Sequence, residues 1–150
     1  DFDKEPYEVL AVEWVELFVA GEKSLTLCPG FTEVQKTLAD HGIRQIILSS
    51  SEREMLMRHL HILGVADAFD HVIGLDNIYA GGKAETAKRR FGDNQADAVM
   101  IGDTTHDADT ARAMGADCIL YSGGHCGRDA LLACGFPVVD RLTDVLPLIL

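Results

Sequence analysis

The chain has 150 residues, of which 47% are hydrophobic and 25% charged, so it has the composition of a folded domain and can bury a core. Its formal net charge of −11 argues against binding to nucleic acid or to an anionic membrane surface. No apolar run is long enough to span a membrane, and no signal-peptide pattern opens the sequence. Its four cysteines form no CxxC pair and lie in or beside apolar segments, which favours reduced thiols and a cytoplasmic protein.

Two helices are predicted at the start of the chain. Residues 7–20 place apolar side chains at helical spacing, and Gly21 is a natural end for such a helix. Valine content and partial alternation leave a strand open as the alternative for this segment. A second helix is expected from Phe31 to His41, entered through Pro29-Gly30.

From residue 44 onward, short apolar runs alternate with segments of helical period. The predicted strands are 44–48, 70–74, 97–101, 117–121 and 137–140. The predicted helices are 52–63, 83–91, 107–114, 128–134 and a closing helix with Leu142, Val145, Leu146 and Ile149. This alternation predicts an α/β fold, a three-layer Rossmann-like doubly wound parallel sheet with helices on both faces.

Polar side chains follow several of these strands. Open parallel sheets bind ligands beyond the carboxyl ends of their strands, so residues at those ends are candidates for a site. They are Ser49, Ser50 and Ser51, then Lys83, then Asp103 and Asp107, and then the loop with Gly123 and Gly124. Hydroxyls, an ammonium and two carboxylates are therefore expected at one edge.

Asp103 and Asp107 lie four residues apart directly after an apolar strand. Two neighbouring carboxylates repel each other unless a cation lies between them. Hard oxygen ligands suit Mg²⁺, which takes one or two carboxylates and completes its shell with water and substrate phosphate. The alternative is structural, with Asp103 in a turn and Asp107 capping a helix.

Lys83 and the serines each have a functional and a structural interpretation. Lys83, after Gly81-Gly82, would neutralise a phosphate or a nucleophilic carboxylate, or it is an exposed lysine of a helix surface. Among Ser49 to Ser51, one hydroxyl and the following amides would bind phosphate oxygens, or one serine caps the next helix. The spacings of His106, His125 and Cys126 match no common zinc pattern, so we interpret them as loop residues.

With these residues identified, the chain resembles the haloacid dehalogenase superfamily, and within it the phosphoglycolate-phosphatase-like branch. The resemblance covers residues 28–150. It rests on "CPGFTEVQKTLADHGIRQIILSSSERE" and "IGDTTHDADTARAMGA". Ser49 falls on the serine or threonine of the second motif of that family, Lys83 on the lysine of the third, and Asp103 with Asp107 on the acids of the fourth.

The resemblance implies a mechanism. An aspartate at the end of the central strand attacks the phosphoryl group, and water hydrolyses the resulting aspartyl-phosphate. A second aspartate, two residues later, is the general acid and base. Mg²⁺ is the implied cofactor, with Asp103 and Asp107 as its ligands. Ser49, Ser50 and Lys83 would bind substrate, and Ser49, Lys83 and Asp103 would take part in catalysis.

The first motif of the family, an apolar strand followed by Asp-x-Asp-Gly-Thr, is not found. "DFDKEP" at residues 1–6 has the Asp-x-Asp spacing without the strand or the Gly-Thr, and we interpret it as coincidence. We therefore expect residues 1–27 to be the tail of a helical cap domain and residues 28–150 to be the core domain. The nucleophile and its strand would then lie upstream of Asp1.

In the family that strand is central, between the strands that end at Ser49 and Asp103. Its loss would leave unpaired backbone groups, each costing about 1–3 kcal/mol when buried. We therefore expect the 150-residue chain alone to be inactive as a phosphatase, and poorly stable unless another segment or chain fills the gap.

The function predicted from sequence is that of a Mg²⁺-dependent phosphatase acting on a small phosphorylated metabolite, with no nucleic-acid or membrane partner. A non-catalytic binding or regulatory protein of this fold, a dehalogenase and a phosphomutase stay open. The substrate cannot be read from the sequence, because specificity in the family depends largely on the cap. The apolar N-terminal helix also leaves formation of a homo-oligomer open.

Overall fold

The computed structural model describes residues 6–75 and 83–150. The helices are α1 (Tyr7–Ala20), α2 (Phe31–Asp40), α3 (Arg53–Ile62), α4 (Lys83–Phe91), α5 (Thr105–Met114), α6 (Arg128–Leu132) and α7 (Leu146–Ile149). The strands are β1 (Ile46–Glu52), β2 (His71–Leu75), β3 (Val99–Gly102), β4 (Asp117–Tyr121) and β5 (Val138–Val139). Short 3₁₀ turns are η1 (Glu22–Ser24), η2 (Ala66–Ala68) and η3 (Leu142–Val145).

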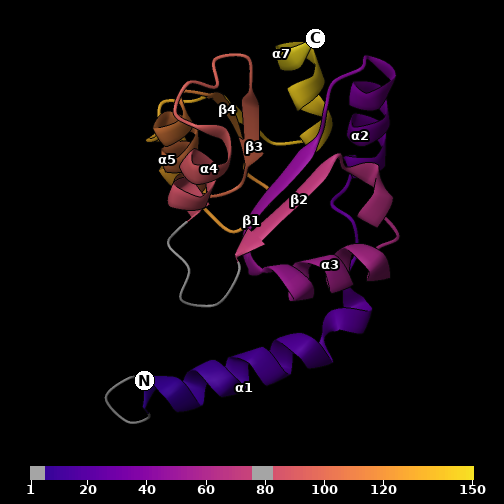
Figure 1. Ribbon diagram of the computed structural model, residues 1–150, viewed down its shortest axis with the longest axis vertical. Coiled ribbons are helices and arrows are strands. Elements are labelled where there is room, and N and C mark those ends of the chain that lie inside the picture. The colour runs from indigo at the N-terminus through magenta and orange to yellow at the C-terminus, as the bar shows by residue number, and fades with distance from the viewer. Residues whose placement is uncertain (1–5, 76–82) are drawn as a thin grey trace.

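The strands form two parallel sheets, and the predicted α/β class is confirmed (Figure 1). One sheet has the order β1-β2, with Ile46 opposite His71. The other has the order β3-β4-β5, with Gly102 opposite Leu120 and Tyr121 opposite Val139. Because Gly102 and Tyr121 end neighbouring strands, the segments that follow β3 and β4 emerge at the same edge.

Helices cover both faces of the larger sheet, and β4 is its most buried strand. On one face Ile119 packs with residues of α2, β5 and η3. On the other face its neighbours Cys118 and Leu120 pack with residues of α5 and α6. Successive side chains of a strand point to opposite faces, so these two clusters give the three layers expected of a doubly wound sheet.

The cysteines are free thiols. Cys118 is buried, and this burial raises the pKa of its thiol to about 12. A thiol with so high a pKa is a core residue with little reactivity.

Most predicted elements are confirmed within a few residues, with three differences. β1 continues to Glu52 instead of ending at residue 48, and the N-cap of α3 is Glu52 rather than a serine. The Glu52 carboxylate accepts hydrogen bonds from the amides of Glu54 (3.0 Å) and Met55 (2.9 Å), which lower its pKa. The closing helix is divided into η3 and α7.

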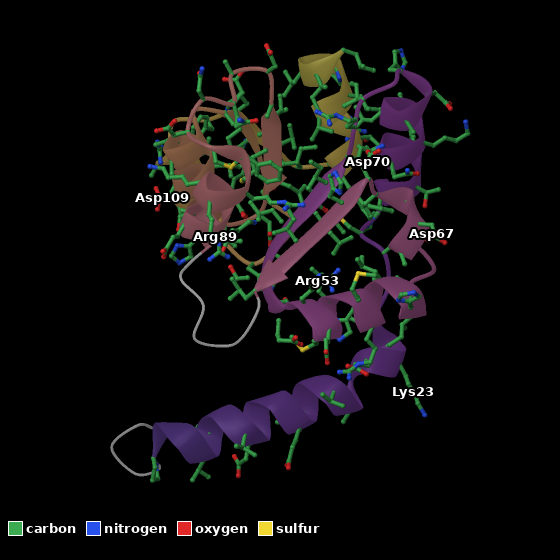
Figure 2. The ribbon with its side chains drawn as sticks, viewed as in Figure 1. Lys23, Arg53, Asp67, Asp70, Arg89 and Asp109 are labelled. Atoms are coloured by element: carbon green, nitrogen blue, oxygen red, sulfur yellow. The ribbon has the colours of Figure 1, made fainter. Side chains whose placement is uncertain are left out.

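Helix α1 lies apart from the two sheets and joins them through η1 (Figure 1). The strand alternative for residues 7–20 was therefore wrong. Glu22 of η1 holds α3, because its Oε1 accepts from Arg58 Nε (2.9 Å) and lies 3.0 Å from His59 Nε2. Lys23 at this junction points into solvent (Figure 2).

No helix in the described part of the chain is long and apolar enough to cross a membrane.

β1 and β3 each have one edge without a partner strand among the residues described. They belong to different sheets, although they are the neighbouring strands of the two sheets in Figure 1. Their apolar side chains are unusually exposed, with Ile46 at 37%, Val99 at 40% and Ile101 at 36%. Interior strands of a parallel sheet are normally buried on both faces, so β1 and β3 have the exposure of edge strands, and the region between their free edges is here called the gap.

The gap predicts a specific pattern of hydrogen exchange in the 150-residue chain. Amides of β4, which has strands on both sides, should exchange at least about tenfold more slowly than amides of β1 and β3. Exchange measured by mass spectrometry or NMR would check this. Equal protection of all three strands would contradict it and show that the gap is closed in solution.

Candidate active site

The turn between β3 and α5 carries the two acids of the predicted site. Asp103 directly follows β3, and Asp107 lies in the first turn of α5. A Cβ atom at Gly102 would fall on the Cβ and carboxyl of Asp107. Glycine is therefore needed before Asp103, because the Asp107 side chain folds back beneath the end of β3.

Asp107 is buried, and donors from its own turn surround its Oδ2 atom. This oxygen accepts from the amide of Asp103 (3.0 Å), the amide of Thr104 (3.0 Å) and the hydroxyl of Thr104 (2.9 Å). Thr104 is the N-cap of α5, and Asp107 completes a capping box with it. The structural alternative, with Asp107 as the N-cap, is therefore wrong in position: Thr104 is the N-cap, and Asp107 is the N3 residue of the capping box.

Lys83 neutralises Asp107. It is the first residue of α4, and its Nζ donates to Oδ1 of Asp107. Side-chain exposure is 17% for Lys83 and 5% for Asp107, so Lys83 is not a solvated surface lysine. Burial acts to raise the pKa of Asp107, but hydrogen bonding and the charge of Lys83, with the donors of Thr104, outweigh it and lower that pKa. Asp107 is therefore ionised at neutral pH.

The sequence analysis explained the closeness of the two acids by a bound cation, and these contacts offer a different explanation. Lys83 and the amides at the start of α5 offset the charge of Asp107, so no metal ion is needed to keep it ionised. Each Asp107 oxygen already has a donor from the chain. Asp103 is thus the acid with more capacity left for a further ligand.

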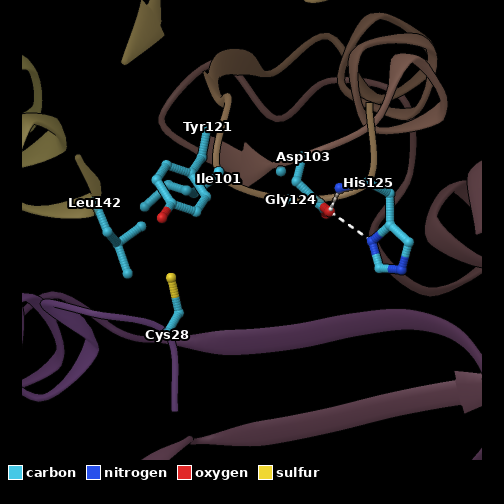
Figure 3. Close-up of a pocket in the computed structure, with 9 residues that line it drawn as sticks. Cys28, Ile101, Asp103, Tyr121, Gly124, His125 and Leu142 are labelled. Carbon is cyan, nitrogen blue, oxygen red and sulfur yellow. Dashed lines mark hydrogen bonds and ion pairs between the residues drawn. The ribbon is translucent and has the colours of Figure 1, made fainter. Parts of the chain in front are cut away.

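Asp103 faces the space beside the free edge of β3. Its Oδ2 accepts from the backbone N–H of His125 (2.8 Å) and lies 2.8 Å from His125 Nδ1 (Figure 3). The Asp103 side chain is 34% exposed and borders a cavity of about 480 Å³. The cavity is lined by Cys28, Ile101, Gly102, Asp103, Tyr121, Gly123, Gly124, His125 and Leu142.

The donor chemistry fits part of a magnesium shell. Within residues 6–75 and 83–150, no three His, Cys, Asp or Glu side chains come together as a metal site. Mg²⁺ needs only one or two carboxylates, because water and substrate oxygens supply the other ligands. Oδ1 of Asp103 accepts no hydrogen bond from the described residues and is the oxygen that could bind the ion.

The predicted serines belong to the other sheet from the strand that precedes Asp103. Ser49 and Ser50 are in β1, where the Ser49 hydroxyl accepts from the amide of Ser51 (3.1 Å) and Ser50 is exposed. In the part of the chain that the structure describes, no hydrogen bond joins Ser49 to Lys83 or Asp103. The structure thus brings Lys83, Asp103 and Asp107 together and leaves the serines in the other sheet. Gly81-Gly82 and the Asp-x-Asp at residues 1–3 lie outside the described residues.

His125 is the residue of this site that sequence analysis missed. It is a loop residue, as expected, but it contacts Asp103 through both its backbone and its ring. A zinc-ligand spacing was the wrong test for a histidine that contacts an acid. The useful signal was its position directly after Gly123-Gly124, at the end of a strand beside β3.

The sequence is similar to known proteins. A family model of haloacid dehalogenase-like hydrolases matches residues 2–115. The pyrophosphatase PpaX of Halalkalibacterium halodurans is 29% identical over 82 residues, which are 52% of this chain and 38% of PpaX. The chain therefore spans well under half of that relative.

Solved structures agree on the fold. A haloacid dehalogenase-like hydrolase of Streptococcus pneumoniae superposes with a TM-score of 0.82 at 19% identity, covering 95% of this chain and 69% of that protein. A Lactobacillus delbrueckii subsp. bulgaricus protein described as a phosphoglycolate phosphatase superposes with a TM-score of 0.69 at 23% identity, covering 81% and 53%. These matches confirm the predicted Rossmann-like fold.

The Lys83–Asp107 ion pair predicts a strong effect on stability. In the full-length protein, meaning the longest natural chain that contains these 150 residues, Lys83→Met should lower the free energy of unfolding by about 3–5 kcal/mol, because it leaves a buried carboxylate without its cation. Denaturant unfolding measures this change.

The double variant Lys83→Met/Asp107→Asn is the matched control. It removes both charges and should recover part of the stability lost in Lys83→Met. Purely additive effects of the two substitutions would show that the two side chains do not interact in solution.

Proposed function

This chain belongs to the haloacid dehalogenase-like hydrolase family, and we propose that it forms the core of a Mg²⁺-dependent phosphatase for a small phosphomonoester. The observation that carries the proposal is the chain of contacts from Lys83 through Asp107 to Asp103, at the carboxyl end of β3. These contacts link one cation, Lys83, to Asp103, whose available carboxylate oxygen borders the cavity described above. Active sites of open parallel sheets lie at such strand ends.

Each residue has a distinct proposed role. Asp103 would bind Mg²⁺ through Oδ1, while Asp107 fixes the Asp103 backbone and orients the Lys83 ammonium. Lys83 would offset negative charge on the transferring phosphoryl group. Ser49 and Ser50 would bind phosphate oxygens from the β1 side of the gap. Bound Mg²⁺ would act as a Lewis acid that stabilises charge on the phosphoryl oxygens.

The gap between β1 and β3 is the proposed place of the nucleophile. A strand inserted there would pair with both free edges and end beside Asp103, Lys83 and Ser49. An aspartate at its end would attack phosphorus and displace the alcohol, which takes a proton from a second acid. Water would then hydrolyse the aspartyl-phosphate and return the carboxylate and phosphate. On this proposal residues 28–150 are the core and residues 1–27 the end of a cap.

The related proteins support the proposed substrate class. PpaX is a pyrophosphatase, and the Lactobacillus protein is described as a phosphoglycolate phosphatase, so both names refer to small phosphorylated compounds. The chain itself carries a net charge of −11, and Lys83 with a bound metal ion would supply the local positive charge that an anionic substrate requires.

Activity assays test the proposed function directly. The full-length protein should hydrolyse p-nitrophenyl phosphate with Mg²⁺ and lose activity when EDTA is added, whereas the 150-residue chain should be inactive. Asp103→Asn should reduce kcat by about 100-fold or more, because it weakens charge stabilisation in the transition state. Phosphate release measures all three.

Asp109→Asn is the matched control, because Asp109 is an acid of α5, the helix that follows Asp103, and its side chain is 67% exposed and paired with Arg112. It should leave kcat unchanged. Phosphate release that persists without Mg²⁺ would contradict the proposed metal dependence, whereas halide release from a haloacid without Mg²⁺ would favour the dehalogenase. A full-length protein that binds phosphate esters without turnover would favour the non-catalytic alternative.

A further inference from the structure

We propose that residues 123–126, here called the Asp103 clamp, position the Asp103 carboxylate for Mg²⁺, with His125 as a positioning residue. This inference rests on the proposed function, because it assigns a purpose to the same site. The clamp follows β4 and reaches the end of β3 from a separate strand. It therefore controls Asp103 independently of the turn in which Asp103 itself lies.

The closeness of the clamp to Asp103 is the first supporting observation. A Cβ atom at Gly124 would fall on Oδ2, Cβ and Cγ of Asp103. A Cβ atom at Gly123 would fall on the ring and hydroxyl of Tyr121. Neither glycine has a positive φ, so the requirement for glycine comes from space and not from backbone strain. Two consecutive glycines thus let the backbone of the clamp lie against the acid.

Hydrogen bonds are the second observation. The His125 amide donates to Asp103 Oδ2 (2.8 Å), the ring Nδ1 contacts the same oxygen (2.8 Å), and the Cys126 amide donates to the Asp103 carbonyl (3.2 Å). The ring contact is a hydrogen bond in the tautomer that carries its proton on Nδ1. The clamp thereby holds both the backbone and the side chain of Asp103.

The third observation is that the side-chain oxygens of Asp103 are used unequally by the clamp. Both contacts from His125 fall on Oδ2, so the carboxylate is fixed with Oδ1 left for another ligand. Asp107 differs, because chain donors reach both of its oxygens. Partners that orient a metal-binding carboxylate in this way typically change metal affinity by about 10- to 100-fold when mutated.

The imidazole of His125 orients the Asp103 carboxylate in this proposal and does not itself bind Mg²⁺. Its side chain is 89% exposed, and its contact with Asp103 lies at the rim of the cavity (Figure 3). A histidine needed only for packing would be buried. A merely structural loop contact would affect stability when removed, but it would not affect Mg²⁺ affinity.

Isothermal titration of Mg²⁺ into the full-length protein tests the inference without relying on activity. Gly124→Ala should weaken Mg²⁺ binding by about 10-fold or more, because its Cβ must displace the Asp103 carboxylate. His125→Ala should weaken it by about 3- to 10-fold, since the backbone N–H bond survives. His125→Asn should restore affinity to within about twofold, because an amide N–H can replace Nδ1.

Gly127→Ala is the matched control in the same loop. No atom lies within 4 Å of a Cβ built there, and its φ of −62° suits alanine. This variant should bind Mg²⁺ like the wild type. Thermal unfolding without Mg²⁺ should show that His125→Ala and His125→Asn have the same Tm, so that their difference in affinity reflects positioning.

The outcomes separate the inference from the proposed function. If Asp103→Asn loses Mg²⁺ binding while Gly124→Ala and His125→Ala retain it, the clamp does not position the acid, and the proposed function stands. If Asp103→Asn also retains wild-type affinity, the proposed metal site itself is wrong. Should Gly124→Ala fail to fold, the pair His125→Ala and His125→Asn still decides, because equal affinities of these two variants would overturn the inference.

Discussion

The ion pair between Lys83 and Asp107 is the interaction on which the site depends. It joins the start of α4 to the start of α5, and the same Asp107 carboxylate accepts the amides of Asp103 and Thr104. One buried acid thus fixes an ammonium, a helix start and the backbone of Asp103, the half-buried acid beside it. These contacts hold Lys83, Asp107 and Asp103 in place without a metal ion. The spacing of Asp103 and Asp107 nevertheless predicts a magnesium site.

The space between β1 and β3 is the second constraint, and it links stability to function. Both strands carry partly exposed apolar side chains, and the candidate residues come from both sheets, with Ser49 in β1 and Asp103 directly after β3. Whatever fills the gap would complete the sheet and bring the two halves of the proposed site together. On the proposed function, one inserted strand would therefore serve both the fold and the chemistry.

Local patterns in the sequence predicted the elements and the grouping of Lys83, Asp103 and Asp107, because strand ends and helix starts follow from periodicity and turn residues. They did not predict Glu52 as the cap of α3, since a glutamate at that position competes with three serines that are better caps by propensity. They also missed His125, whose role comes from a contact between two loops that are distant in sequence. Spacing along the chain carries no signal for such a contact, and only the pairing of β3 with β4 brings the two loops together.

A crystal structure of the full-length protein with Mn²⁺ in place of Mg²⁺ and with tungstate as a phosphate mimic tests the central claim most directly. The account predicts an anomalous manganese peak bound to Oδ1 of Asp103, in a space closed by a strand between β1 and β3. Tungstate should lie between that ion, Lys83 and Ser49. Manganese bound away from Asp103, or a gap that no strand occupies, would contradict the account.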